Sequence, residues 1–386
     1  MDRVYLDHAA TTPLDPEVAE LMARVLREVA GNPSSIYAEG RAARAVVDRA
    51  RDEVAAAIGA EPREIVFTSG GTEADNLALR GALKATRAER DHLVTTAIEH
   101  HAVLDTARDL EASAHVRLTV LPVGPDGRVT AAAVDEAVDE RTALVSVMHG
   151  NNEIGTLQPI AEIGAVCRAR GVPFHSDAVQ TVGALPLDVR TIPVDLLSVN
   201  AHKFYGPKGV GALYVRTGTK VATMQTGGGQ EKGRRTGTET VVGIVGLGAA
   251  LRIAAARRER ESARQSELRD RLIAGIEARI PDALLTGHRS VRLPNNVSFC
   301  FRGTQGEALI VALDLAGFAA SSGSACTSGS TEPSHVLLAL GLERDLAQGS
   351  LRLTIGRDTT AAQVDALLQA LPPIVARLRA VSAVSA

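Results

Sequence analysis

Cysteine is scarce in this chain, which has three among 386 residues: Cys167, Cys300 and Cys326. The number is odd and no two of them form a CxxC pair, which excludes a disulfide framework and a cysteine-rich zinc site. Cys300 lies in a strand pattern and Cys167 in a helical one, so we expect both to be inert core residues. Cys326 is left as the one candidate for a reactive thiol.

Long apolar runs and a strong charge of either sign are also missing. No run reaches the length needed to cross a membrane, and the first residues lack the hydrophobic segment of a signal peptide. The formal net charge is −3, which argues against non-specific binding to nucleic acid or to a membrane surface. We therefore expect a cytoplasmic protein with no membrane contact and no direct contact with nucleic acid.

Lysine is rare as well, since the chain has only five against many arginines: Lys84, Lys203, Lys208, Lys220 and Lys232. Lys203 follows the apolar run 194–199 and precedes a Gly-Pro turn signal, so it stands at the carboxyl end of a predicted buried strand. A lysine in that position is partly desolvated, which lowers its pKa and makes it a candidate Schiff-base amine. A loop lysine that faces solvent would leave the same local pattern.

The length and the pattern of segments predict two domains with an α/β fold. Strand and helix patterns alternate through the first two thirds of the chain, which is typical of a mostly parallel sheet flanked by helices. Seven strands are expected in this sheet, at residues 64–68, 92–97, 116–123, 143–148, 172–176, 194–199 and 210–215.

After Gly243 the sequence changes character. A long Arg/Glu-rich helix at about 257–279 is followed by strands, helices and a Ser/Gly-rich loop, which predicts a smaller α+β domain. We expect a large cofactor-binding domain over 14–255, and a small domain formed by 1–13 together with 256–386. The elements expected in the small domain are strand 296–301, helix 305–315, strand 351–355 and a last helix from about 360.

A glycine-rich turn follows the first strand. In Ser69-Gly70-Gly71-Thr72 the glycines let the backbone approach a ligand closely, and Thr72 stands where a helix begins. Free N–H groups and the helix dipole at such a point suit a phosphate. The GK[ST] ending of a P-loop is absent, and Thr72 with Asp75 would equally make a simple capping box.

The next strand ends carry histidine and asparagine. His100 and His101 follow strand 92–97, where a histidine can stack on an aromatic cofactor or move protons. A metal site is the poorer interpretation because no carboxylate or cysteine stands at a supporting spacing, and a surface histidine would look the same. Asn152 follows strand 143–148 and offers an uncharged amide, although paired asparagines also favour turns.

Asp177 follows strand 172–176. A carboxylate at a buried strand end is costly unless it is paired, and a protonated ring nitrogen is a suitable partner. Asp177, Lys203 and the glycine-rich turn together meet the requirements of pyridoxal 5'-phosphate. The lysine binds the aldehyde, the aspartate keeps the ring nitrogen protonated, and the turn anchors the phosphate.

Two further features come from the second part of the chain. Small residues surround Cys326 in the loop at about 321–333, which predicts an accessible thiol that can be carried to a cofactor. Arg352 lies in an otherwise apolar strand, where a guanidinium suits a carboxylate. A structural salt bridge would also explain this arginine.

Together these motifs resemble the cysteine desulfurases, pyridoxal-phosphate enzymes of the class V aminotransferase group with the fold-type I architecture. The long cysteine loop, which continues through 331–334, resembles the subgroup that serves nitrogenase and housekeeping iron–sulfur assembly. The resemblance extends over nearly the whole chain and is carried by residues 5–13, 31–35, 67–73, 99–105, 151–155, 177–180, 201–209, 236–238 and 322–326.

The resemblance implies a role for each residue around the cofactor. Lys203 would hold the cofactor and shuttle the Cα proton of L-cysteine, and His100 would stack on the ring and assist proton transfer. Asp177 would pair with the ring nitrogen, and Gln180 would bond to the ring hydroxyl. The residues that would hold the phosphate are Gly71, Thr72, Asn200, His202 and Thr238 of the partner subunit.

Substrate binding and sulfur transfer would follow from the same resemblance. Arg352, with Asn152 and Asn32, would bind the substrate carboxylate. The thiolate of Cys326 would take the sulfur as a persulfide, release L-alanine and pass the sulfur to a protein acceptor such as an iron–sulfur scaffold. No metal is implied, and Thr238 implies a homodimer.

Two positions depart from the family pattern, and other functions stay open. Many relatives have serine where Asn200 stands, and histidine where Tyr37 stands. A selenocysteine lyase or an aminotransferase of the same fold is a second enzymatic hypothesis, in which an aminotransferase would not need Cys326. A non-enzymatic scaffold that binds sulfur carriers is a third.

Overall fold

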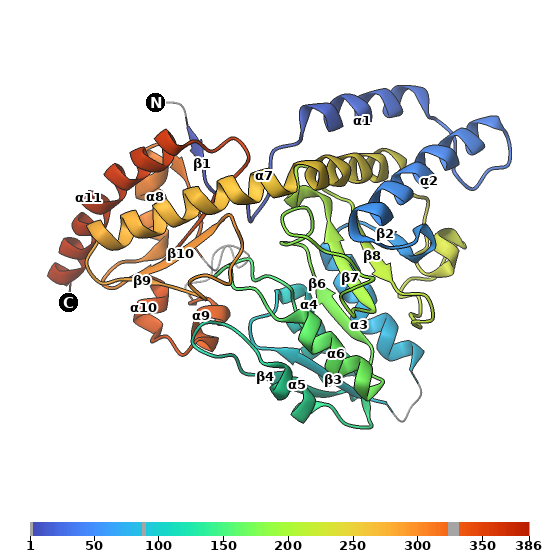
Figure 1. Ribbon diagram of the computed structural model, residues 1–386, viewed down its shortest axis with the longest axis horizontal. Helices are drawn as coiled ribbons and strands as arrows, with labels where there is room; N and C mark the ends of the chain where they lie inside the picture. The colour runs from blue at the N-terminus through green and yellow to red at the C-terminus, as the bar shows by residue number, and fades with distance from the viewer. Residues whose placement is uncertain (1–2, 87–89, 323–331, 386) are drawn as a thin grey trace.

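A computed structural model describes residues 3–86, 90–322 and 332–385 (Figure 1). Its centre is a seven-stranded sheet with the strand order β2-β8-β7-β6-β5-β3-β4. Each of the seven predicted strands is present, within a few residues of its expected bounds. The strands are β2 (Ile65–Thr68), β3 (His92–Thr96), β4 (Arg117–Leu121), β5 (Thr142–Ser146), β6 (Phe174–Asp177), β7 (Leu196–Asn200) and β8 (Gly211–Val215).

Most neighbouring strands of this sheet run parallel. The pairs from β4 through β3, β5 and β6 to β7 are parallel, whereas β8 is antiparallel to both β7 and β2. The predicted mostly parallel α/β sheet is therefore confirmed. Because β8 is antiparallel to both of its neighbours, β2 runs in the same direction as β7. The carboxyl end of β2 therefore lies at the same edge of the sheet as that of β7.

Both faces of the sheet are buried, which explains why its strands read as nearly continuous apolar runs. On one face Val66, Leu144 and Leu213 pack with helices α3 (Gly71–Ala85) and α4 (His101–Ala114). On the other face alternate residues pack with the remaining helices of this part of the chain. These are α1 (Pro16–Glu28), α2 (Ala38–Ile58), α5 (Ala131–Ala137), α6 (Ile160–Arg170) and the first half of α7 (Val241–Arg279).

A second apolar core lies around a three-stranded antiparallel sheet, at the left of Figure 1. Its strands are β9 (Ala283–Leu285), β10 (Asn296–Phe301) and β12 (Ser350–Thr354). Helices α8 (Gly306–Leu315) and α11 (Ala361–Ser385) pack on it. The amino terminus returns to this core, because β1 (Val4–Tyr5) pairs with β11 (Phe318–Ala319). Two short helices, α9 (His335–Ala339) and α10 (Arg344–Gln348), belong to a separate small apolar cluster with Ile98, Met148 and Ile154 from the loops of the large sheet and Cys300 of β10.

Helix α7 differs from the expectation, since it begins at Val241 and not near residue 257. Its first half is rich in glycine, which hid the helical pattern. A Cβ at Gly246 would lie 2.7 Å from the sulfur of Met22, and one at Gly248 would lie 2.9 Å from the Cα of Ala50. The glycines thus permit close packing against α1 and α2, and the single long helix joins the two cores (Figure 1). None of the described helices is long and apolar enough to cross a membrane.

Candidate active site

A cavity of about 290 Å³ lies at the carboxyl edge of the large sheet. It forms there because β2, β3, β5, β6 and β7 all end at this edge and continue into loops or helix starts. The cavity collects ten of the residues predicted from the sequence: Gly71, Thr72, His100, Asn152, Asp177, Gln180, Asn200, His202, Lys203 and Arg352.

Lys203 enters the cavity from a short 3-10 turn, Ala201–Lys203, directly after β7. Its Nζ donates hydrogen bonds to the carbonyl oxygens of Ala9, at 2.5 Å, and Ala10, at 2.8 Å. The side chain of Gln180 donates to the same Ala9 oxygen at 3.1 Å. Residues 7–15, which we name the amino-terminal strap, therefore lie against the lysine amine and orient it.

Asp177 is the last residue of β6 and faces the same cavity. One of its carboxylate oxygens accepts a hydrogen bond from the Val179 N–H at 2.8 Å. Burial raises its pKa to about 6, although this hydrogen bond and the charge of Lys203 act in the opposite direction. The carboxylate is mostly ionised at neutral pH and is buried, which suits it to a cationic partner inside the cavity.

The turn between β2 and α3 presents a helix amino terminus to the cavity. Gly70 is the N-cap of α3, and within the described chain no side chain caps this end. A Cβ at Gly71 would lie 2.9 Å from a methyl group of Val179, so a larger residue would close the approach. The capping-box alternative is wrong, because α3 has already begun at Gly71 and Thr72 lies inside it. The helix end keeps its N–H groups for an anion.

His202 and Asn200 lie beside this turn. The ring Nδ1 of His202 is 3.1 Å from the hydroxyl of Thr11, in the strap. Burial, and then the charge of Lys203, lower the pKa of His202 to about 4, so the ring is neutral at neutral pH. The side-chain oxygen of Asn200 is buried and finds no hydrogen-bond partner among the described residues.

His100 is the N-cap of α4, and its Nδ1 accepts a hydrogen bond from the Ala102 N–H at 3.1 Å. This bond leaves the ring proton on Nε2. Burial, and then the charge of Lys203, lower the pKa of His100 to about 4. His101 turns instead toward Asp105, at 3.0 Å. Among the described residues no group of three or more His, Cys, Asp or Glu side chains could hold a metal ion.

Arg352 is 3% exposed, on β12, and reaches across to the cavity. It donates to the Asn152 carbonyl at 3.0 Å and to the Asp7 carboxylate at 2.8 Å. Its Nε is buried and has no acceptor in the part of the chain that the structure describes. Arg352 therefore makes a structural ion pair and also borders the cavity, and its binding of a ligand carboxylate stays a prediction.

Two predicted site residues that the structure describes, Asn32 and Thr238, do not line this cavity. Asn32 is exposed, and its side chain accepts a hydrogen bond from the Ser34 N–H at 2.9 Å. Thr238 is exposed and outside the lining. Cys326 lies outside the described residues. The prediction that Cys167 and Cys300 are core residues is confirmed, since both are buried and burial raises the pKa of each to about 12.

The sequence reasoning missed a buried polar layer beside the cavity. Asp75, on α3, lines the cavity and has its Oδ1 3.6 Å from His175 Nε2. The His175 ring also contacts the hydroxyls of Ser146, at 2.8 Å, and Ser198, at 3.0 Å. Burial, and then the charge of Asp177, raise the pKa of Asp75 well above its ordinary value. The signal in the sequence that could have revealed this layer is Asp75, a polar residue at a core position of α3.

Glu99 belongs to the same set of buried carboxyl groups. It is fully buried, and accepts hydrogen bonds from the hydroxyl of Thr96 at 2.6 Å and from the Met148 N–H at 3.0 Å. Burial raises its pKa from 4.5 to about 8, although these hydrogen bonds lower it. Between pH 4.5 and about pH 8, Glu99 is therefore protonated in the folded protein and ionised in the unfolded chain.

Glu99→Gln is therefore expected to flatten the pH dependence of stability. Because the folded state binds the extra proton, wild-type stability falls as pH rises from about 4.5 to about 8. The variant cannot titrate there, so its urea midpoint should decline less between these pH values. Glu277→Gln, which removes a surface carboxylate paired with Arg289, is the control and should keep the wild-type decline. An equal decline in Glu99→Gln and wild type would contradict this assignment.

The cavity fits pyridoxal 5'-phosphate by the chemistry of its lining. It offers an amine, a buried carboxylate and an uncapped helix end, which match an aldehyde, a ring nitrogen and a phosphate. Three buried polar atoms of residues that line it have no hydrogen-bond partner among the described residues: Asp75 Oδ1, Asn200 Oδ1 and Arg352 Nε. Orphaned polar atoms at one cavity indicate a polar ligand.

Comparisons with known proteins agree with this chemistry. The model of the aminotransferase class-V family matches residues 4–367. The cysteine desulfurase IscS of Clostridium botulinum (strain Kyoto / Type A2) is 48% identical over 382 residues, which cover 98% of this chain and 96% of the relative. IscS of Methanosarcina thermophila is also 48% identical, over 98% of this chain and 93% of its own length.

Solved structures give the same result. A NifS-like protein superposes with a TM-score of 0.91 at 35% identity, covering 97% of this chain and 100% of that protein. SspA in complex with cysteine superposes with a TM-score of 0.80 at 36% identity, covering 91% and 98%. The family model, the sequence relatives and the solved structures each match nearly the whole length of this chain. The chain belongs to the class V aminotransferase family and, within it, to the pyridoxal-phosphate-dependent cysteine desulfurases.

Proposed function

We propose that this cavity desulfurates L-cysteine, with the predicted residues in the roles that their positions support. The observation that carries the proposal is the placement of Lys203 and Asp177 after adjacent strands. Both line one cavity, and an uncapped helix end borders the same cavity. Lys203 would hold pyridoxal 5'-phosphate, and Asp177 would keep a proton on its ring nitrogen. Gln180 would bond to its hydroxyl, and His100 would lie against its ring.

The phosphate would lie at the start of α3. Its ligands would be the N–H groups of Gly71 and Thr72, with the side chains of Thr72, Asn200 and His202. A neutral His202 is suited to donate a hydrogen bond from Nε2, provided that its Nδ1 accepts from Thr11. Asn200 would contact the phosphate through its amide N–H group, because an amide oxygen only accepts, and its Nδ2 lies 3.3 Å from the place that a Cβ at Gly71 would take.

The substrate carboxylate would lie against Arg352. The Nε of Arg352 is buried and has no acceptor among the described residues. The other two guanidinium nitrogens donate to the Asn152 carbonyl and the Asp7 carboxylate, and these bonds fix the guanidinium plane. We propose Asn152 as a second contact. Asn32 lies outside the cavity of its own chain, so it would take part only from a partner subunit.

The bound cofactor supplies an electron sink for the substrate carbon. The amine of Lys203 would move the Cα proton. The thiolate of Cys326 would then attack the substrate sulfur: an S–S bond forms, the C–S bond breaks, and its electron pair stays on carbon, which is protonated to give L-alanine. Cys326 retains the sulfur as a persulfide, so no external oxidant is required.

We propose that a protein thiol, such as that of an iron–sulfur scaffold, accepts this persulfide sulfur. A cytoplasmic location fits that exchange, because the cytosol keeps acceptor thiols reduced. We also propose a homodimer. Thr238 is exposed and lies outside the cavity of its own chain, so it would reach a phosphate only in a neighbouring subunit.

The test is to incubate the cofactor-loaded protein with L-cysteine and a reductant and to measure alanine and sulfide together. Equal amounts are expected from wild type, and Cys326→Ala should lower both by about 10²-fold or more, because the sulfur has no nucleophile to receive it. Cys167→Ala removes a buried thiol outside the cavity and is the control.

Two other outcomes would point elsewhere. Alanine and sulfide that persist in Cys326→Ala would show that Cys326 is not the nucleophile. A protein that binds the cofactor but transfers the amino group of L-cysteine to a keto acid would be an aminotransferase.

A further inference from the structure

The chain is strained two residues after Lys203. Tyr205 has φ +66°, in the left-handed region that a bulky non-glycine residue rarely adopts. Such a conformation persists only where its surroundings hold it. Two of these contacts come from the amino-terminal strap: the Tyr205 N–H donates to the Thr12 hydroxyl at 2.7 Å, and the Asp15 N–H donates to the Tyr205 carbonyl at 3.0 Å.

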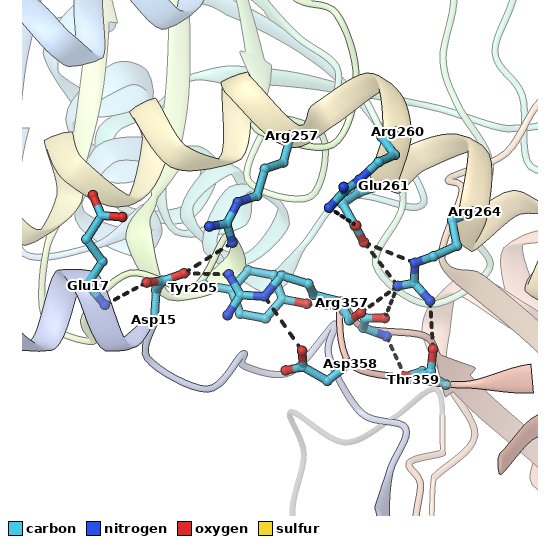
Figure 2. Close-up of polar contacts among 11 residues, drawn as sticks. Asp15, Glu17, Tyr205, Arg257, Arg260, Glu261, Arg264, Arg357, Asp358 and Thr359 are labelled. Atoms are coloured by element: carbon cyan, nitrogen blue, oxygen red, sulfur yellow. Dashed lines mark hydrogen bonds and ion pairs between the residues drawn. The ribbon is translucent and has the colours of Figure 1, made fainter. Parts of the chain in front are cut away.

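Further contacts of Tyr205 come from Arg357, which follows β12 in the small core. Its guanidinium carbon lies 4.3 Å from the centroid of the Tyr205 ring, a cation–π arrangement. Its backbone N–H donates to the Tyr205 hydroxyl at 2.6 Å. Its NH1 also donates to the Asp15 carboxylate at 2.5 Å (Figure 2). One side chain thus binds both the strained residue and the strap.

The ion pair of Arg357 with Asp15 is largely withdrawn from solvent, since the two side chains are 17% and 5% exposed. Burial alone would raise the pKa of Asp15, but the hydrogen bonds from Arg357 and from the Glu17 N–H, with the nearby arginine charges, bring it below its ordinary value. Arg257 on α7 also lies 3.7 Å from the Asp15 carboxylate, so removing Arg357 takes away the shorter of two cationic contacts and leaves Asp15 with Arg257 and the Glu17 N–H (Figure 2).

The loop that carries Arg357 is itself held by α7. Arg264 on that helix donates to the carbonyls of Gly356 and Arg357, both at 2.8 Å, and of Thr359 at 2.6 Å (Figure 2). The guanidinium of Arg357 therefore projects from a backbone that Arg264 holds at three carbonyl groups.

Packing alone does not fix the lysine that these contacts surround. Lys203 borders the cofactor cavity on one side and a second cavity on the other, and Asp15, Tyr205 and Arg357 line that second cavity. The hydrogen bonds from its amine to the Ala9 and Ala10 carbonyls tie the amine to the strap. The strap also binds the backbone of this loop, since the Thr12 N–H donates to the His202 carbonyl at 2.9 Å.

We infer that Arg357 is a positioning residue for Lys203. It clamps Tyr205 and Asp15, and these hold the strap whose Ala9 and Ala10 carbonyls receive the lysine amine. This inference rests on the proposed role of Lys203. Through this clamp, the small core and its Arg357 set the geometry of an amine carried by the large sheet.

The first measurement is amide hydrogen exchange of the Thr12 and Tyr205 N–H groups, with and without cofactor. Arg357→Ala should speed exchange at both by about tenfold or more, because the clamp that closes them is lost. Exchange in the strands of the large sheet should stay at the wild-type rate. Arg271→Ala, which removes an arginine paired with Asp365 on the surface of the small core, is the matched control and should change neither amide.

The second measurement separates kcat from KM for alanine release. A misplaced amine slows proton transfer without weakening substrate binding, so Arg357→Ala should lower kcat by about tenfold or more at nearly constant KM. Tyr205→Phe, which removes only the hydroxyl, should give a smaller change in the same direction and covers the case in which Arg357→Ala does not fold. Tyr205→Gly relieves the strained φ and removes the ring that Arg357 covers.

A double-mutant cycle tests whether Arg357 acts on Lys203 through Tyr205. If Arg357 acts largely through Tyr205, then Arg357→Ala should cost much less in the Tyr205→Gly background than in wild type. Full additivity would refute the route through Tyr205. Unchanged exchange and kcat in both Arg357→Ala and Tyr205→Phe would overturn the inference while wild type still makes alanine. Absence of alanine from wild type would instead refute the proposed function.

Discussion

Lys203→Ala is expected to lower alanine formation from L-cysteine by at least about 10⁴-fold, because one side chain supplies both the covalent attachment and the proton transfer. The amine lies at the end of β7 and is oriented by the carbonyls of Ala9 and Ala10. Among the residues that line the cavity, Lys203 is the one that carries an amine. The described residues of the lining include no second lysine that could replace it.

Two measurements check this expectation. Reduction of the loaded protein with borohydride, followed by peptide mass analysis, should place the cofactor on Lys203 in wild type and on no lysine in the variant. Lys220→Ala, an exposed lysine outside the cavity, is the control and should retain wild-type turnover. Alanine formation by Lys203→Ala within tenfold of wild type would contradict the assignment.

Asp177→Asn is expected to lower kcat by about 10³-fold, with a much smaller change in substrate binding. An amide of the same shape can keep the hydrogen bond from the Val179 N–H but carries no charge. It therefore cannot hold a proton on the ring nitrogen, and the ring loses its capacity to accept electrons from the substrate carbon. Because Asp177 is buried, no solvent anion can replace it.

The matched control for Asp177 is Asp195→Asn. Asp195 accepts a hydrogen bond from the Phe174 N–H at 2.9 Å, and burial raises its pKa, but it lies at the opposite edge of the same sheet. The control should keep wild-type kcat even if it loses some stability. Stopped-flow measurement of single turnovers on both variants separates chemistry from product release, and an equal kcat in Asp177→Asn and wild type would refute the role.

Much of the fold and of the cavity was accessible from the sequence because both depend on local patterns. Largely apolar segments of five to eight residues between turn signals located the strands of the large sheet. Once the strands are parallel, their carboxyl ends must share an edge, so Asp177 and Lys203 had to meet there. Gly71 was visible because a glycine-rich turn before a helix has a local signature.

Short elements and glycine-rich helices carried too little pattern to be found. Strands β9 and β11 have three and two residues, less than a period-two pattern needs. The first half of α7 was hidden because Gly246 and Gly248 serve packing against α1 and α2, and that requirement overrides helix propensity.

The sequence by itself determined the α/β class, the strand positions and the chemical groups at the strand ends, because these follow from periodicity and residue type. The tertiary structure decided which distant groups meet. It paired Arg352 with Asp7, buried Asp75 beside Asp177, and brought Arg357 onto Tyr205. No local pattern encodes such contacts, since each joins segments whose proximity is set only when both cores pack around the same strap and helix.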